Sequence, residues 1–506
     1  MSEPVTITFS PRSAKSEKDR DTEGIKKDSI NSQRGFKMLS LSKCVPRRTQ
    51  IQLAKKSLFR TFTTSADKTW SLSRRFMTSA DYIAGDDLYG SHNYHPLPVV
   101  LCRGEGVNVF DVEGRRYLDF LAGYSAVNQG HCHERLVKVM QQQCEQLTLV
   151  SRAFHSNQFA PYAELMTKTF GYDRVLPMNT GVETGETALK LCRRWAYDVK
   201  GVKNNEALMI YPAGNFWGRT LAAISSSSDK ESFGGFGPLL PGYLSIPYND
   251  LKALEKCLEE YGHRVAAYMA EPIQGEAGVI VPSPGYLRGV RELCNKHNVL
   301  LVADEVQTGL ARTGKMLACD WEDVKPDILL LGKALSGGML PVSAILANSD
   351  IMLTIKPGQH GSTYGGNPLA CAVASEAIKV IIDERMAENA QARGEEVRAA
   401  LSKLATTLTA GTIRDVRGRG LLNAIEFKPN MVDDKGRPLS AYDICIELKD
   451  AQVRHGAQVG LLCKPTHEHT IRLAPPLIIT KEMLQEAMEI FSFVVQESLA
   501  GRNRKA

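Results

Sequence analysis

Short apolar runs alternate with amphipathic stretches over the middle of the chain, from about residue 131 to residue 375. The clearest runs, at residues 299–303 and 328–331, consist almost entirely of aliphatic side chains and end next to charged residues or glycine. Such runs predict strands that are buried on both faces. Because strands that alternate with helices form parallel sheets, we predict an α/β fold whose larger domain is a mainly parallel sheet wrapped by helices.

The two ends of the body of the chain predict a second, smaller α+β domain. Three strand-like runs between residues 99 and 120 are separated by glycine-containing turns, which predicts a small antiparallel meander. Residues 387–404 have the period of an amphipathic helix, and residues 421–427 and 470–473 are strand-like. We therefore expect the small domain to be built from segments at both ends, residues 81–130 and 381–506, with the large domain at residues 131–380 between them.

The first 80 residues differ from the rest and predict a disordered extension. Residues 1–37 are polar and include six acidic side chains, which is typical of disorder. From residue 38 the extension resembles a transit peptide, because residues 38–80 are rich in Ser and Thr and hold nine Lys or Arg against a single acid. The acidic first segment does not fit a mitochondrial presequence unless translation starts at Met38. We expect the mitochondrial matrix as the location, with a basic disordered tail and the cytoplasm as the alternative.

Composition excludes several functional classes. The formal net charge is +6, but the residues outside 38–80 sum to −2, so the body is mildly acidic and a nucleic-acid role is not supported. No apolar run approaches the roughly 18 residues that a membrane span needs. The 11 cysteines contain no C-x-x-C pair, which favours reduced thiols inside a cell. His131, Cys132 and His133 are too close in sequence to enclose one ion, and we expect no metal.

Two polar residues end neighbouring apolar runs and carry the candidate chemistry. Asp304 follows the run at 299–303, and Lys333 follows the run at 328–331. The carboxyl ends of parallel strands meet at one crevice, so both side chains would project into it. Burial lowers the pKa of an amine, and a neutral amine can condense with a carbonyl. An aldehyde cofactor with a pyridine ring needs such an amine and a carboxylate that keeps the ring nitrogen protonated. Taken alone, the lysine could instead extend into water and the acid could cap a turn.

A glycine-containing helix start offers a place for the phosphate of such a cofactor. Residues 180–191 begin with small polar and acidic residues and continue with apolar positions, which predicts the first turns of a helix. Free N–H groups at a helix start bind phosphate, and Gly181 lets the backbone approach closely. Residues 361–368 form a second glycine-rich loop with hydroxyl side chains. An ordinary helix cap and an ordinary turn are the alternatives.

Together these segments resemble the class III pyridoxal-phosphate aminotransferases of fold type I. The resemblance extends from about residue 86 to the C-terminus and is strongest to members that act on ornithine. It implies that the large domain binds pyridoxal 5'-phosphate. The segments that carry it are HNYHPLP (92–98), YSAVNQGHCH (124–133), LPMNTGVETGETALKL (176–191), GNFWGRT (214–220), EPIQGEAGV (271–279), ADEVQTGLARTGK (303–315), LLLGKALSGG (329–338), HGSTYGGNP (360–368), RGRGLLNA (417–424) and IRLAPPL (471–477).

The resemblance implies roles for residues around the cofactor ring. Lys333 would form a Schiff base with the aldehyde and later move a proton. Asp304 would pair with the pyridine nitrogen, and Gln307 would hydrogen-bond the ring hydroxyl. Phe216 would stack on the ring.

The same resemblance implies how the phosphate is held. The backbone N–H groups of Gly181 and Val182 would bind it. Thr363, together with Ser362, would reach the phosphate of a neighbouring subunit's cofactor, which implies a homodimer with cofactor sites at the interface.

The resemblance also implies a substrate pocket with a gate. Arg219 would hold the substrate α-carboxylate, and Tyr94 and Tyr124 would line the pocket that accepts ornithine. Glu276 and Arg472 would pair while ornithine is bound, and Arg472 would be free to bind a carboxylate of 2-oxoglutarate. Such a gate cancels whichever charge is wrong for each substrate, because a desolvated mismatch would cost several kcal/mol.

The implied activity is transfer of the δ-amino group of L-ornithine to 2-oxoglutarate, giving glutamate 5-semialdehyde and glutamate with ping-pong kinetics. The first alternative is a related class III enzyme that acts on acetylornithine or 4-aminobutyrate, or a semialdehyde aminomutase. The second is a binding protein that kept the scaffold and lost catalysis, although neither Lys333 nor Asp304 is missing. A nucleotide-dependent dehydrogenase is not supported, because no G-x-G-x-x-G follows a predicted strand.

Overall fold

The computed structural model describes residues 78–501 of the chain. The predicted disordered extension of residues 1–80, including its transit-peptide-like part from residue 38, lies outside the described residues except for the last three, where helix α1 (Ser79–Tyr89) begins. Between residues 78 and 501, no helix is both long and apolar enough to cross a membrane. Nor does any group of three or more His, Cys, Asp or Glu side chains in that range have an arrangement that could hold a metal ion.

A seven-stranded sheet forms the centre of the larger domain, in the strand order β4-β10-β9-β8-β7-β5-β6. Strand β10 runs antiparallel to both of its neighbours, and all the other pairs are parallel. The predicted α/β fold with a mainly parallel sheet is therefore confirmed. The strands are β4 (Arg174–Met178), β5 (Leu208–Pro212), β6 (Tyr243–Ile246), β7 (Val265–Ala270), β8 (Leu300–Asp304), β9 (Ile328–Leu331) and β10 (Ser343–Ala347).

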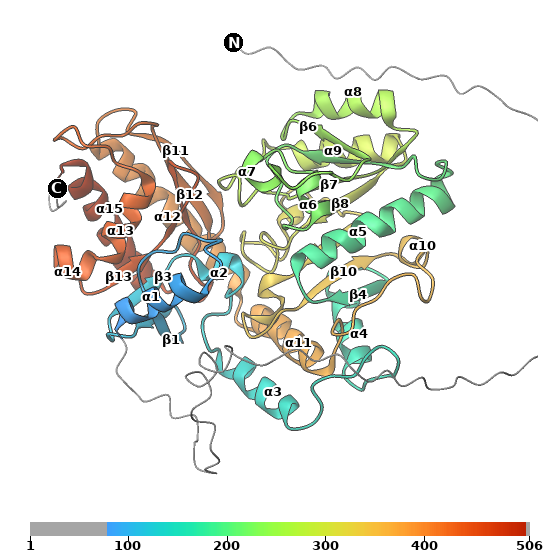
Figure 1. Cartoon of the computed structure of the whole chain (residues 1–506), viewed down its shortest axis with the longest axis horizontal. Helices are drawn as coiled ribbons and strands as arrows, with labels where there is room; N and C mark the ends of the chain where they lie inside the picture. Colours follow the sequence, from blue (N-terminus) through green and yellow to red (C-terminus); the bar gives the residue numbers. More distant parts are fainter. Residues whose placement is uncertain (1–77, 502–506) are drawn as a thin grey trace, which may run out of the picture. The chain divides into compact units, whose positions relative to one another are not determined.

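Helices cover both faces of this sheet (Figure 1). Every residue of β5, β7, β8, β9 and β10 is buried, which is why these strands are continuous apolar runs rather than alternating ones. Along β9, Leu330 packs with the residues of α5 on one face, and Leu329 and Leu331 pack with those of α4 and α11 on the other. The helices of this domain are α3 (Glu134–Cys144), α4 (Phe159–Phe170), α5 (Gly181–Trp195), α6 (Leu221–Ser225), α7 (Lys230–Phe233), α8 (Leu251–Tyr261), α9 (Tyr286–Lys296), α10 (Ser349–Met352) and α11 (Pro368–Asp383), with short helical turns η1 (Ala196–Lys200), η2 (Ala318–Trp321) and η3 (Lys333–Ser336).

The smaller domain contains two four-stranded sheets, in the orders β1-β2-β3-β13 and β11-β12-β15-β14. The first three strands form the predicted antiparallel meander, and β13 from the C-terminal segment adds to it in parallel. The strands are β1 (Leu101–Glu105), β2 (Asn108–Asp111), β3 (Arg116–Asp119), β11 (Ile413–Arg419), β12 (Leu422–Phe427), β13 (Gly460–Leu462), β14 (Lys464–Thr466) and β15 (Thr470–Leu473). The helices are α2 (Ala122–Ser125), α12 (Met386–Thr407), α13 (Ala441–Lys449), α14 (Ala451–His455) and α15 (Lys481–Leu499).

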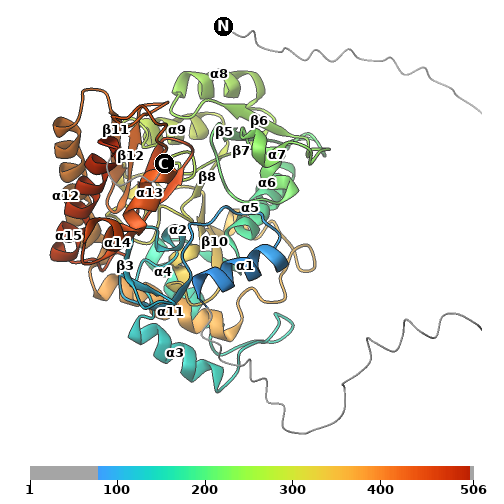
Figure 2. The same cartoon turned by 60° about the vertical axis from the view of Figure 1, so that its left-hand side comes forward.

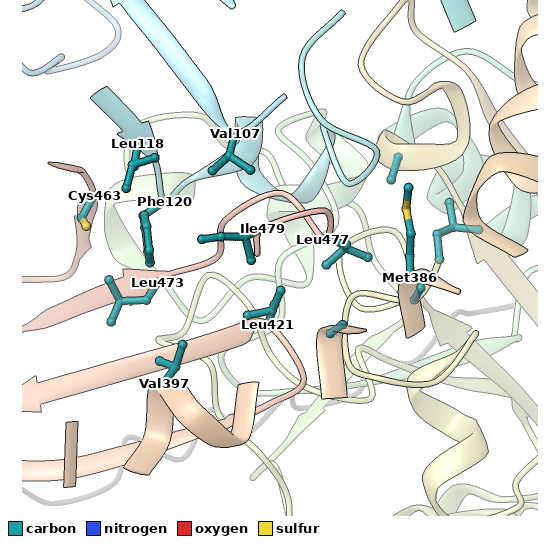
Figure 3. Close-up of a cluster of buried hydrophobic side chains, with 14 of the residues drawn as sticks. Val107, Leu118, Phe120, Met386, Val397, Leu421, Cys463, Leu473, Leu477 and Ile479 are labelled. Carbon is teal, nitrogen blue, oxygen red and sulfur yellow. The ribbon is translucent and has the colours of Figure 1, made fainter. Parts of the chain in front are cut away.

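Side chains from both ends of the described chain share the core of the smaller domain. Leu118 and Phe120 from the N-terminal segment lie beside Leu473, and Val397 of α12 points into the same cluster (Figure 3). Both overall views place α12 and α15 on one side of the β11–β12 strands (Figures 1 and 2). The segments therefore meet as expected, while the domain limits at residues 81–130, 131–380 and 381–506 stay a prediction.

A glycine in the middle of α12 permits a close helix–sheet contact and gives a testable prediction. A Cβ atom on Gly394 would overlap the backbone carbonyl of Gly420, which lies in the β11–β12 turn. Because backbone atoms have no rotamer to change, Gly394→Ala is expected to lower the free energy of unfolding by about 1–3 kcal/mol. Thermal denaturation measures this change. Gly85→Ala in α1 is the matched control, since a Cβ there meets no atom within 4 Å; equal midpoints for the two variants would contradict the prediction.

Candidate active site

Asp304 and Lys333 lie on one cavity at the carboxyl ends of β8 and β9. The two strands are parallel neighbours in which Asp304 is paired with Leu330, and Lys333 follows β9 after a single glycine. The cavity has a volume of about 160 Å³. Its lining residues are Gly181, Val182, Phe216, Trp217, Gly218, Glu271, Asp304, Val306, Gln307 and Lys333. Six of the eight residues predicted to hold the cofactor are thus brought together: Gly181, Val182, Phe216, Asp304, Gln307 and Lys333.

The environment of the Lys333 amine suits a group that condenses with a carbonyl. Burial lowers the pKa of Lys333, although the nearby carboxylates of Glu276 and Asp304 act in the opposite direction. No described residue accepts a hydrogen bond from its Nζ. The backbone of Lys333 has φ +45°, a left-handed conformation that is unfavourable for a side chain with a Cβ. Strain of this kind persists where the surrounding structure requires it, often at reactive residues.

Asp304 offers a buried carboxylate with one oxygen to spare. Its Oδ1 accepts a hydrogen bond from the Val306 N–H at 3.0 Å, and no described residue donates to Oδ2. Burial raises the pKa of Asp304 to about 6, against the Val306 N–H and the Lys333 ammonium, which both act to lower it. A cationic N–H donor in the cavity would favour the ionised form of this carboxyl.

Helix α5 directs its N-terminus at the cavity. The Thr180 side chain caps the helix, and the Glu183 carboxylate accepts a hydrogen bond from the Thr180 N–H, so the capping box is complete. The first N–H groups of a helix have no acceptor within the helix, and those of Gly181 and Val182 belong to this set. Gly181 is required because a Cβ there would lie 2.9 Å from Val306 Cγ1. The helix start predicted from the sequence is therefore confirmed.

Glu276 and Arg472 form a closed, two-pronged ion pair. Arg472 Nη1 donates to Glu276 Oε1 and Nη2 to Oε2, each at 3.1 Å. Gln307 lies between them, donating to Glu276 at 3.0 Å and accepting from Arg472 at 3.0 Å. Only 2% of Arg472 is exposed. Burial acts to raise the pKa of Glu276, but Arg472, Lys333 and Gln307 together outweigh it, so the pKa lies below its ordinary value.

Of the predicted substrate residues, Tyr124 lies beside this pair, whereas Tyr94 and Arg219 are exposed. The Tyr124 ring centre is 5.3 Å from the Arg472 guanidinium carbon. Tyr94 is 72% exposed and does not line the cavity; the Lys464 ammonium lies 5.9 Å from its ring centre. Arg219 is exposed, and its guanidinium carbon lies 5.6 Å from the centre of the Phe216 ring.

The glycine-rich loop before α11 does not reach the cavity of its own chain. Thr363 is exposed and Ser362 is half-buried, and neither lines the cavity. Asn179, just before the start of α5, donates from Nδ2 to Ser362 Oγ at 3.0 Å. The prediction that these residues serve a second subunit is compatible with this exposure but is not tested by a single chain.

The sequence analysis assigned no role to Glu271, which lines the cavity and is 4% exposed. Its signal was present, because it directly follows the apolar run of β7 just as Asp304 ends that of β8. Trp217, Gly218 and Val306 complete the walls and were also missed. A larger groove of about 560 Å³ lies between α12 and α15, but it contains none of the predicted site residues.

The cavity residues fit pyridoxal phosphate. The spare oxygen of Asp304 suits a protonated pyridine nitrogen, and the Lys333 amine suits an aldehyde. The N-terminus of α5 suits a phosphate, because Gly181 and Val182 line the cavity and their N–H groups have no acceptor within the helix. The Phe216 ring supplies an aromatic wall.

Comparisons with known proteins agree with this geometry. Residues 89–495 match the family described as Aminotransferase class-III. The mitochondrial ornithine aminotransferase of Rattus norvegicus is 55% identical over 415 residues, which cover 82% of this chain and 90% of that protein. A solved ornithine aminotransferase of Toxoplasma gondii, described with partial occupancy of PLP at its active site, is 46% identical with a TM-score of 0.79 and covers 85% of this chain and 97% of its own.

A relative with a different name is similar to nearly the same degree. The acetylornithine aminotransferase structure from Elizabethkingia anophelis is 49% identical with a TM-score of 0.73, covering 83% of this chain and all of its own. Fold and sequence therefore agree on the family, while the identity of the amine substrate depends on the residues of the active site. The chain belongs to the class III aminotransferases, a family of pyridoxal-phosphate-dependent enzymes.

Proposed function

We propose that this chain transfers the δ-amino group of L-ornithine to 2-oxoglutarate, forming glutamate 5-semialdehyde and glutamate. The observation that carries the proposal is the closed Glu276–Arg472 pair beside the cavity, bridged by Gln307. A diamine and a dicarboxylate make opposite demands on one site, and a pair that opens and closes serves both.

The chemistry divides between the cofactor and the chain. When bound, pyridoxal phosphate supplies an electrophilic aldehyde carbon and a ring that withdraws electrons from the neighbouring carbon. Lys333 would hold it through Nζ, and its free amine would remove a proton from the substrate δ-carbon. Asp304 would keep the ring nitrogen protonated, Gln307 would bind the ring hydroxyl, and Phe216 would cover one face of the ring.

The remaining site residues orient the two substrates. Arg219 binds the α-carboxylate of ornithine, while Tyr94 and Tyr124 form the pocket around it. The closed gate keeps the Arg472 charge away from the ammonium groups of ornithine. Opening the gate exposes Arg472 to the second carboxylate of 2-oxoglutarate.

An amine-substrate assay tests the proposal. The purified enzyme, loaded with pyridoxal phosphate, is incubated with 2-oxoglutarate and ornithine, and the cyclised semialdehyde is trapped and measured. Acetylornithine and 4-aminobutyrate serve as parallel substrates. Turnover of ornithine well above both supports the proposal, whereas good turnover of acetylornithine without product from ornithine overturns it.

The gate gives a separate prediction. In Glu276→Gln, Arg472 loses its ionic partner, so kcat/KM of the ornithine half-reaction should fall about 30-fold, the lower end of the loss expected when one partner of a buried charge pair is removed. The half-reaction with glutamate should fall less or rise, because Arg472 is then always available. Single-turnover absorbance changes measure both rates. Glu164→Gln, in an exposed pair with Lys168, is the control; equal losses with both substrates would count against a gate.

A second copy of the chain completes the proposed site. Ser362 and Thr363 lie outside the cavity of their own chain and are available to a partner's phosphate site. We therefore propose a homodimer, and sedimentation should show a dimer. A fully active monomer would contradict this.

The proposed location is the mitochondrial matrix. The basic, nearly acid-free composition of residues 38–80 supports it, as do relatives whose names include the word mitochondrial. Imaging a fusion that begins at Met38 beside one that begins at residue 81 tests the segment. Equal distribution of the two would refute the targeting role.

A further inference from the structure

The buried carboxyl of Glu271 joins two loops in the wall of the cavity. Its Oε2 accepts a hydrogen bond from the Phe216 N–H at 3.0 Å, and its Oε1 accepts one from the Gly275 N–H at 3.0 Å. Each oxygen thus holds a different loop, and the side chain is 4% exposed. A buried acceptor of this kind is costly to lose because both backbone donors would then be unsatisfied.

The two loops carry different parts of the site. The first places the Phe216 ring in the cavity wall. The second continues from Gly275 directly to Glu276 of the gate. It also packs closely on Gln307, because a Cβ on Gly275 would lie 2.5 Å from Gln307 Oε1. Gln274, in the second loop, also donates a hydrogen bond to the Ala213 carbonyl at 2.8 Å.

We propose that Glu271 is a positioning residue that holds the aromatic wall at Phe216 and the gate turn at Gly275–Glu276 at a fixed spacing. Cofactor binding and substrate selection then both depend on the two hydrogen bonds that Glu271 accepts. This inference rests on the proposed function, because it deepens the account of the same site. In this role Glu271 does not need to contact the reacting atoms.

The neighbourhood of Asp304 fits this role. Ala270 pairs with Ala303 in the parallel β7–β8 ladder, so Glu271 and Asp304 come next at the same end of adjacent strands. Burial, reinforced by the charge of Asp304, raises the pKa of Glu271 to about 8.

A graded series of variants tests the positioning role of Glu271. Glu271→Met removes both acceptors and Glu271→Gln keeps one. Glu322 offers a matched control outside the cavity, since it is 7% exposed and accepts from the Gly285 and Arg288 N–H groups, one per oxygen, at 3.1 Å each. Glu322→Met therefore removes the same number of buried bonds elsewhere.

Amide hydrogen exchange of the holoenzyme measures directly how well Glu271 holds the two loops. In Glu271→Met, peptides covering residues 214–220 and 272–278 should both exchange about tenfold faster, as expected when buried hydrogen bonds are lost, with Glu271→Gln intermediate. Glu322→Met should affect the peptide around residues 285–288 and leave those two unchanged. Unchanged exchange in either site peptide of Glu271→Met overturns the proposal.

Cofactor affinity and half-reaction rates provide the second test. Glu271→Met should weaken pyridoxal-phosphate affinity, measured by absorbance titration of the cofactor-free protein, and should shift the ratio of ornithine to glutamate half-reaction rates by about tenfold. Combining it with Glu276→Gln should not add a further shift in that ratio, because both act through the gate turn. A fully additive shift, or a loss equal to that of Glu322→Met, overturns the proposal. If the wild type fails to turn over ornithine, the proposed function fails, while the exchange result still decides the role of Glu271.

Discussion

Replacing Lys333 with alanine is expected to abolish turnover. The loss should reach about 10⁴-fold, the upper end of what a positioned proton-transfer group contributes, because the same nitrogen also holds the cofactor. The variant should also lose the absorbance band of the cofactor bound through Nζ. Steady-state assay with ornithine and an absorbance spectrum of the cofactor-loaded protein measure both effects.

The same substitution should leave the fold intact. Burial lowers the pKa of Lys333, so holding its charged form costs free energy in the folded chain, and its removal should not lower the thermal midpoint. Lys252→Ala, at an exposed position on α8, is the control for activity and stability. Borohydride treatment of the wild type should fix the cofactor on the peptide that contains Lys333. Labelling of another peptide, or retained turnover in Lys333→Ala, would rule out the assignment.

Asp304→Asn is expected to have the next largest effect. A neutral amide cannot keep the pyridine nitrogen protonated, so turnover should fall roughly 10²–10³-fold, a loss in the range for removing one electrostatic contact to the transition state. Asp304→Glu keeps the charge and should retain more activity than Asp304→Asn. Equal activity of the wild type and Asp304→Asn would exclude the pairing with the ring.

Asp304 also predicts a pH dependence for cofactor affinity. Burial raises its pKa from 3.8 to about 6. Only the ionised carboxylate pairs with a protonated ring nitrogen, so cofactor affinity should weaken as the pH falls through about 6. Equilibrium titration with pyridoxal phosphate from pH 5 to pH 8 should show this dependence in the wild type and a flatter profile in Asp304→Asn.

The stability of the cofactor-free protein should depend on the same carboxyl with the opposite sign. A raised pKa means that the folded chain prefers the protonated form, so the stabilising contribution is fully present below pH 3.8 and is lost as the pH rises through about 6. The difference in free energy of unfolding between wild type and Asp304→Asn, measured across that window, should change accordingly.

Several parts of the site could be predicted because their signals are local. A buried strand is a continuous apolar run, so the polar residue at its end is visible, and Asp304 and Lys333 were found in this way. The start of α5 was visible because Thr180 and Glu183 form a capping box within four residues. The direction of a strand could not be read from its sequence in the same way. Strand β10 is as apolar as the parallel strands β7, β8 and β9, yet it runs antiparallel to its neighbours β4 and β9.

Other features depend on neighbours far away in the sequence. The Glu276–Arg472 pair closes a separation of 196 residues, and its geometry comes from the contact between the two domains. Glu271 is significant only because the Phe216 and Gly275 backbones both turn toward it. Ser362 and Thr363 carry suitable hydroxyl groups, but the folded chain leaves them outside its own cavity.

The sequence by itself determined the alternation of strands and helices, the family, and which amine and carboxylate stand at the ends of neighbouring strands, because periodicity and side-chain chemistry are properties of short segments. Only the tertiary structure decided which groups are desolvated together and which hydrogen bonds they share. Both depend on the arrangement of distant segments. They lower the pKa of Lys333, raise that of Asp304 and hold Arg472 against Glu276.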